Sequence, residues 1–101
     1  MPTIYLSIGN SDNKLTQEQW SWYVKDMHAL VFQWSLNTHG IWFSEASSQY
    51  QNACWCLDVM SSVIPAMKRD LAHLAHTYQQ DSIAWMQGTT EFILAAKDER
   101  E

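Results

Sequence analysis

Residues 16–34 read TQEQWSWYVKDMHALVFQW, and this stretch carries a complete signal for an amphipathic helix. Thr16 suits the N-cap position, and Gln19, three residues later, completes a capping box in which each side chain bonds the backbone N–H of the other. Apolar residues then recur at spacings of three and four, as on one face of a helix. They are Trp20, Tyr23, Val24, Met27, Leu30, Val31 and Trp34. Asn37 suits the position just past the helix end, and Gly40 indicates that the helix has ended by then.

A strand precedes this helix. Ile4, Leu6 and Ile8 alternate with polar or smaller residues, the pattern of a strand with one buried face. Residues 9–13 read GNSDN, five residues that favour turns, so the strand ends there and a loop leads to the helix.

Two further strands follow the helix. Residues 41–45 are predicted as a strand with Ile41 and Phe43 on one face and Trp42 and Ser44 on the other. Residues 46–51 form a polar connection. Residues 52–59 then alternate again, with the apolar residues at odd positions: Ala53, Trp55, Leu57 and Val59.

The C-terminal third predicts a second helix and a fourth strand. Pro65 suits the first turn of a helix, whose buried stripe continues to Tyr78. Residues 79–81 end the helix, and residues 82–86 form a strand with Ile83 and Trp85 facing inward. The apolar residues 92–94 are expected either to add a short edge strand or to dock as a tail.

The resulting order, strand–helix–strand–strand–helix–strand, resembles the ferredoxin-like superfold over nearly the whole chain. That resemblance implies an α+β sandwich: a four-stranded antiparallel sheet, in the order 4-1-3-2, with two helices on one face. We expect a single α+β domain over residues 1–96 and a charged, solvated tail over residues 97–101. The superfold includes enzymes, metal carriers, RNA binders and regulatory ligand domains, so it implies no particular function.

Charge and composition exclude some partners. The chain of 101 residues has six Lys and Arg against eleven Asp and Glu, a net charge of −5. Proteins that bind the DNA or RNA backbone usually have a basic face, so we expect neither as a partner. The sequence shows neither a signal peptide nor a membrane-spanning run, which favours a cytoplasmic protein that binds no membrane and keeps Cys54 and Cys56 reduced.

The sheet face away from the helices is the first candidate interaction surface. The predicted alternation gives it two large aromatic side chains among small ones, with no charge in its middle. The residues are Tyr5, Ser7, Trp42, Ser44, Cys54, Cys56, Ser82 and Ala84. The chain contains six tryptophans, more aromatic surface than a small core readily hides. We therefore expect a homo-oligomer that associates through this face, with a flat ligand stacked there as the alternative.

A polar edge of the sheet is the second candidate. The predicted topology brings together the loop after the first strand, the connection between the second and third strands, and the end of the second helix. The N-terminus of the first helix lies at the same edge and offers free N–H groups to an anion. These elements contribute Asn10, Ser11, Asp12, Gln51, Asn52, His76 and Asp81. Dense amides and hydroxyls with few charges favour a small polar or anionic ligand.

Catalytic chemistry is sparse in this sequence. Cys54-Trp55-Cys56 lacks the spacing and the second pair of a zinc knuckle, and its thiols are interpreted as small structural residues. Arg69, His73 and His76 share one face of the second helix and are interpreted as a solvated surface. We assign no catalytic residue, metal ligand or cofactor.

The sequence therefore predicts a non-catalytic binding protein that holds a nucleotide-like signalling molecule as a homo-oligomer, in the manner of small phage or bacterial proteins that sequester such molecules. The expected ligand contacts are the seven residues of the polar edge together with Tyr5, Ser7, Trp42 and Ser44. One alternative is a metal-dependent hydrolase or nuclease that uses Asp12 and Asp81, since small ferredoxin-like nucleases have a carboxylate after the first strand. The other is a protein–protein adaptor, such as an inhibitor, that uses the open sheet face with Trp22 and Phe32 on the first helix.

Overall fold

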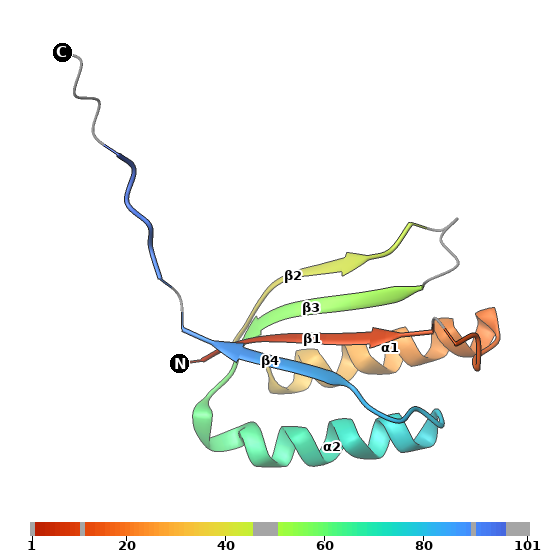
Figure 1. The fold of residues 1–101 in the computed structure, drawn as a ribbon. Coiled ribbons are helices and arrows are strands. Elements are labelled where there is room, and N and C mark those ends of the chain that lie inside the picture. Colours follow the sequence, from red (N-terminus) through yellow and green to blue (C-terminus); the bar gives the residue numbers. More distant parts are fainter. Residues whose placement is uncertain (1, 11, 46–50, 90, 97–101) are drawn as a thin grey trace.

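A computed structural model describes residues 2–10, 12–45, 51–89 and 91–96 of the chain (Figure 1). The strands are β1 (Thr3–Gly9), β2 (Asn37–Phe43), β3 (Asn52–Asp58) and β4 (Ala84–Gly88). The helices are α1 (Gln17–Trp34) and α2 (Ile64–Thr77), and a short 3-10 turn, Ser61–Val63, leads into α2. No helix in the described residues is both long and apolar enough to cross a membrane.

The sheet has the order β2-β3-β1-β4, and all its pairings are antiparallel. Figure 1 shows α1 and α2 on the same side of the sheet. The predicted α+β, ferredoxin-like fold is therefore confirmed.

The core lies between the helices and one face of the sheet. The inward residues of the two central strands are 0–3% exposed: Ile4, Leu6, Ile8, Ala53, Trp55 and Leu57. Each helix contributes a buried stripe with helical spacing: Tyr23, Met27 and Val31 from α1, and Met67, Leu71 and Ala75 from α2. The apolar residues at every second position of the strands and at helical spacing in α1 and α2 therefore form one apolar layer.

The predicted capping box at the start of α1 is confirmed. The backbone N–H of Gln19 donates to Thr16 Oγ1 at 3.1 Å, and the N–H of Thr16 donates to Gln19 Oε1 at 2.9 Å. Two of the free N–H groups at this helix end are therefore occupied by side chains.

β2 begins four residues earlier than the alternation predicted, at Asn37 rather than at residue 41. Hydrogen bonds to Asp58 hold this end of the strand: just before it the N–H of Leu36 donates to Asp58 O, and the His39 imidazole contacts the Asp58 carboxylate at 2.8 Å. Pairing passes from Thr38↔Leu57 to Gly40↔Cys56, so β2 contains one extra residue, His39, as a bulge. Because an edge strand can be held by hydrogen bonds along one side, this part needs no apolar alternation.

β4 is also displaced, covering Ala84–Gly88 rather than residues 82–86. Trp85 faces the helices as predicted, and the shift adds Met86 to the opposite face, where it pairs with Tyr5. Residues 91–96 form neither helix nor strand and lead away from the sheet in Figure 1, so within the described residues neither the edge strand nor the docked tail forms. The expected charged tail, residues 97–101, lies outside the described residues.

Candidate functional site

Asn10 is the centre of the polar edge, and its side chain is buried, with 1% exposure. Its Nδ2 donates to the carbonyl of Leu15 at 3.0 Å and to Gln51 Oε1 at 3.1 Å, while its Oδ1 accepts from the N–H of Leu15 at 3.0 Å. This amide therefore fastens the β1–α1 loop to the start of β3. A ligand reaching Asn10 would have to displace these bonds.

Gln51 is also engaged by its neighbours. It forms two reciprocal amide hydrogen bonds with Gln17 in the first turn of α1, at 2.9 and 2.7 Å. Beside it, the backbone N–H of Asn52 donates to Ser44 Oγ at 3.0 Å, and the N–H of Ser44 donates to Asn52 O at 3.0 Å. These contacts close the edge between β2 and β3.

Asp12 and Asp81, the candidate carboxylate pair, both lie near the ammonium group of Lys14. Lys14 Nζ lies 3.7 Å from Asp12 Oδ2 and 3.6 Å from Asp81 Oδ2. The Asp81 side chain is 94% exposed, so water screens this bridge and it contributes little stability. Ser11, also predicted here, lies outside the described residues. Among the described residues, no group of three or more His, Cys, Asp or Glu side chains has the geometry to hold a metal ion.

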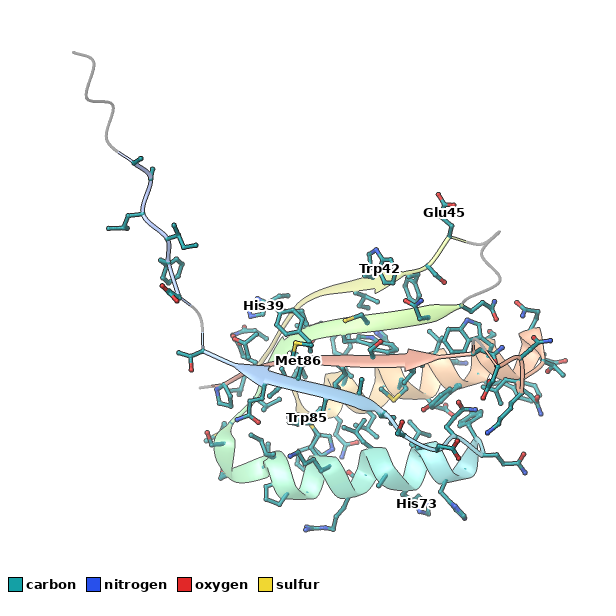
Figure 2. All side chains as sticks on the ribbon, viewed as in Figure 1. His39, Trp42, Glu45, His73, Trp85 and Met86 are labelled. Carbon is teal, nitrogen blue, oxygen red and sulfur yellow. The ribbon has the colours of Figure 1, made fainter. Side chains whose placement is uncertain are left out.

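A groove of about 430 Å³ lies between α2 and β4, next to the polar edge. Its apolar wall consists of Leu71, Ala72, Ala75, Ile83 and Trp85. Its polar groups are Lys68, His76, Gln80, Asp81 and Ser82. Figure 2 shows Trp85 between β4 and α2, and the Lys68 ammonium nitrogen lies 4.9 Å from the centre of its ring. The volume is within the usual range for small-ligand pockets, and the mixture of one aromatic wall and a few polar groups is typical of them.

The groove contains two of the predicted ligand residues, His76 and Asp81. Sequence reasoning missed its cation, Lys68, and its aromatic wall, Trp85. The available signal was the pair Ala72 and Ala75, three residues apart on α2. Two alanines at that spacing remove side-chain volume from one helix face, and a groove remains where β4 passes it.

The predicted residues Tyr5, Ser7 and Trp42 lie on the opposite face of the sheet. Tyr5 pairs with Cys56 on one side and Met86 on the other, and Trp42 pairs with Cys54. Figure 2 shows Trp42 and Met86 on the side away from the helices, and Trp42 is 58% exposed. The sheet itself separates these aromatic residues from the α2–β4 groove, so one ligand cannot contact both.

The Cys54 thiol on this face is not activated. Burial, followed by the nearby Cys56, raises the pKa of Cys54. A hydrogen bond with Cys56 is the main cause that raises the pKa of Tyr5. A nucleophilic cysteine needs a lowered pKa, so Cys54 has the properties of a structural thiol.

Comparisons with known proteins give a likeness of fold only. No protein-family model matches the chain, and no curated protein matches its sequence. Among solved structures, the chain is similar to a formyltetrahydrofolate deformylase from Burkholderia mallei ATCC 23344, with a TM-score of 0.52 and 11% identity. The similarity covers 86% of this chain but only 27% of the deformylase chain.

Proposed function

We propose that this protein is a non-catalytic binding protein that holds a small, planar, anionic molecule of nucleotide-like chemistry in the α2–β4 groove. The observation that carries the proposal is the combination in one groove of an indole, a lysine and neutral hydrogen-bonding groups. Sequestration or sensing of a signalling nucleotide in the cytoplasm of a bacterial or phage-infected cell is the role that fits this chemistry.

The ligand class follows from the groove lining. The indole of Trp85 offers an apolar wall for a base, and the ammonium group of Lys68 offers a charge for a phosphate. Gln80 and Ser82 supply a neutral amide and hydroxyl for the polar edges of a base or sugar. Asp81 accepts hydrogen bonds from sugar hydroxyl groups and disfavours a second phosphate at its end of the groove.

Binding without turnover is favoured by how the carboxylates are used. The hydrolase alternative needs Asp12 and Asp81 free to ligate a metal, yet both lie beside Lys14. A lysine between two carboxylates competes with a divalent cation for the same oxygens. Incubation with Mg²⁺ and a panel of nucleotides, followed by analysis of the products, separates the two functions. A non-catalytic binding protein is expected to hydrolyse none of the nucleotides.

The direct test is native mass spectrometry of freshly purified protein, followed by calorimetric titration with nucleoside monophosphates and cyclic nucleotides. Lys68→Ala is expected to weaken the binding of a phosphate-containing ligand about tenfold or more, through loss of a charge-assisted contact. Ala72→Leu, which fills the groove from an exposed position, is expected to abolish binding.

Two matched variants control for these changes. Lys25→Ala and Ala29→Leu make the same substitutions at exposed positions of α1, outside the groove. Equal loss of binding in these controls, or full binding by Ala72→Leu, would place the ligand elsewhere.

A second part of the proposal is self-association through the open face, meaning the sheet face that carries Tyr5, Ser7, Trp42, Cys54, Cys56, Ala84 and Met86. Three large side chains in this set are substantially exposed: Tyr5 at 46%, Trp42 at 58% and Met86 at 68%. They lie on three of the four strands, with the thiols of Cys54 and Cys56 on β3 between Trp42 and Tyr5, and an exposed face with several large apolar side chains typically marks a protein interface.

A further inference from the structure

The C-terminal segment, defined here as residues 91–96, is the most exposed apolar stretch in the described chain. It reads EFILAA, and Phe92, Ile93 and Leu94 are 84%, 92% and 86% exposed. Single exposed apolar residues are common in monomers, but three large ones in succession are unfavourable in water unless a partner covers them. An apolar surface that the segment does not contact in this structure is therefore needed to cover these side chains.

The open face is a surface of matching chemistry. Its described side chains are aromatic, thioether, thiol, methyl and hydroxyl groups. A carboxylate, Asp58, lies at one end, where it already accepts a hydrogen bond from Thr3 Oγ1 at 2.9 Å and contacts His39. Because the segment has its single described charge at Glu91, its apolar part can cross the face without burying an unpaired ion.

The dimensions of the two elements agree. Six extended residues reach about 20 Å. Four strands about 4.8 Å apart place the outermost strand axes about 14 Å from each other. The segment is therefore long enough to cross all four strands and to contact the side chains of β1, β2 and β4 together.

The area that a stable dimer needs points to the segment as well. Four strands of at most seven residues make a face of at most about 19 by 23 Å, so two such faces pressed together without the segments bury no more than roughly 900 Å². Specific, stable interfaces start at about 1,200 Å². When the segments cover the faces instead, three large apolar side chains from each copy bury on the order of 150 Å² apiece, and the faces beneath them lose a similar area, so the reciprocal contact exceeds that limit.

We propose that the C-terminal segment of one copy packs on the open face of a second copy, and that the exchange is reciprocal about a two-fold axis. This inference rests on the proposed self-association and names the element that completes it. A second copy is favoured over the segment's own sheet because the segment leads away from that sheet, at the end where Gly88 pairs with Thr3 (Figure 1). In a two-fold exchange, each segment is buried and each open face is covered, so the pair is closed.

The first experiment measures oligomeric state by sedimentation velocity at about 50 µM protein. The tail variant is Phe92→Ser/Ile93→Ser/Leu94→Ser, and the face variant is Trp42→Ser/Met86→Ser. Both sets of positions are exposed, so each monomer is expected to fold normally. The wild type is expected to be a dimer, and each variant is expected to dissociate with a Kd raised roughly 100-fold or more.

The matched control is Phe32→Ser, which removes an aromatic ring that is 62% exposed on α1. This variant is expected to remain a dimer with wild-type affinity. Dissociation of Phe32→Ser would assign the interface to the helices and overturn the inference.

The second experiment mixes the tail variant with the face variant, each of which lacks a different half of the contact. One intact segment then meets one intact face, so a heterodimer is expected, with lower affinity than the wild type. If each segment instead folds over its own sheet, no heterodimer forms and the inference is wrong.

The remaining outcomes separate this inference from the self-association it rests on. A tail variant that stays dimeric while the face variant dissociates leaves the face as the interface and removes the segment from it. A wild-type monomer at 50 µM overturns both. Ligand binding in the α2–β4 groove is measured separately by titration, and the tail variant is expected to retain it, because no described residue of the segment lines that groove.

Discussion

Trp55 and Trp42 lie in neighbouring strands of one sheet, and their surroundings are opposite. Trp55 of β3 faces the helices, is fully buried, and donates a hydrogen bond from Nε1 to His28 Nδ1 at 3.3 Å. Trp42 of β2 faces away from the helices and is 58% exposed. The sheet therefore has one face closed by its own helices and one whose aromatic surface is exposed. Burial by the chain itself, rather than residue type, decides which tryptophan stabilises the monomer.

Replacing each tryptophan by alanine tests this contrast with the largest expected effect on stability. Trp55→Ala is expected to lower the free energy of unfolding by about 3–5 kcal/mol, since it removes a buried indole and leaves a cavity. Trp42→Ala is expected to change the stability of the monomer by less than about 1 kcal/mol. Urea denaturation of dilute protein measures both, and comparable losses would show that the open face is covered within the monomer.

The same contrast between buried and exposed groups can be sharpened at the polar edge. Asn10→Ala removes a buried amide with three hydrogen bonds and leaves the Leu15 backbone unpaired, so a loss of about 2–3 kcal/mol is expected. Gln17→Ala removes an exposed amide of similar chemistry and is expected to cost less than about 1 kcal/mol. Thermal unfolding of the two variants provides the measurement. A small effect of Asn10→Ala would mean that the loop is held by its backbone bonds alone.

Alkaline titration tests how two tyrosines on the helix side of the sheet contribute to stability. Burial raises the pKa of Tyr23 to about 12, and burial with a hydrogen bond to Asp26 raises that of Tyr78 to about 12. In the unfolded chain both pKa values are about 10. The folded state therefore keeps these protons longer, so the stability they contribute is complete below pH 10 and is lost as the pH rises to about 12. Absorbance at 295 nm should show Tyr23 and Tyr78 ionising together with unfolding. Ionisation of these two tyrosines near pH 10 in the folded protein would contradict the prediction.

The smallest expected effect concerns Asp58, at one end of the open face. Hydrogen bonds from Thr3 and His39 lower the pKa of its carboxyl group below the ordinary value. The resulting stability is present above the unfolded pKa of about 3.9 and is lost as the pH falls through the lowered folded value. Asp58→Asn should lower Tm by a few °C at pH 7, and this decrease should become smaller as the pH falls below about 3.9. A decrease in Tm that stays the same as the pH is lowered would assign the effect to packing.

The sequence predicted the fold because local signals and long-range pattern agree there. The capping box from Thr16 to Gln19 fixes the start of α1, and the odd–even alternation of β3 matches its buried face along the whole strand. The edge strands were less predictable. β2 is held partly through the side chains of His39 and Asp58, a contact between residues 19 positions apart that no hydrophobic pattern reveals.

The candidate site could be predicted only in part, because it depends on how two surfaces meet. His76, Asp81 and their neighbours were recognisable as polar residues at one edge of the sheet. The groove itself forms where Ala72 and Ala75 of α2 pass Trp85 of β4, and that distance depends on the packing of the helix on the sheet. Asn10 shows the converse case, since its residue type suggested ligand contact while its hydrogen bonds hold the loop together.

The extra residue in β2 bears on whether other chains can add to the edge of the sheet. An unpaired edge strand presents a row of free N–H and C=O groups to which other chains can add, and such addition has no natural end. The bulge at His39 interrupts the regular spacing of that row, and β4, at the other edge, has only five residues. Neither edge is a good template for growth into fibrils. An aromatic-rich chain of this length can therefore expose apolar side chains on one face, where the proposed association would end at two copies, without offering its edges to open-ended polymerisation.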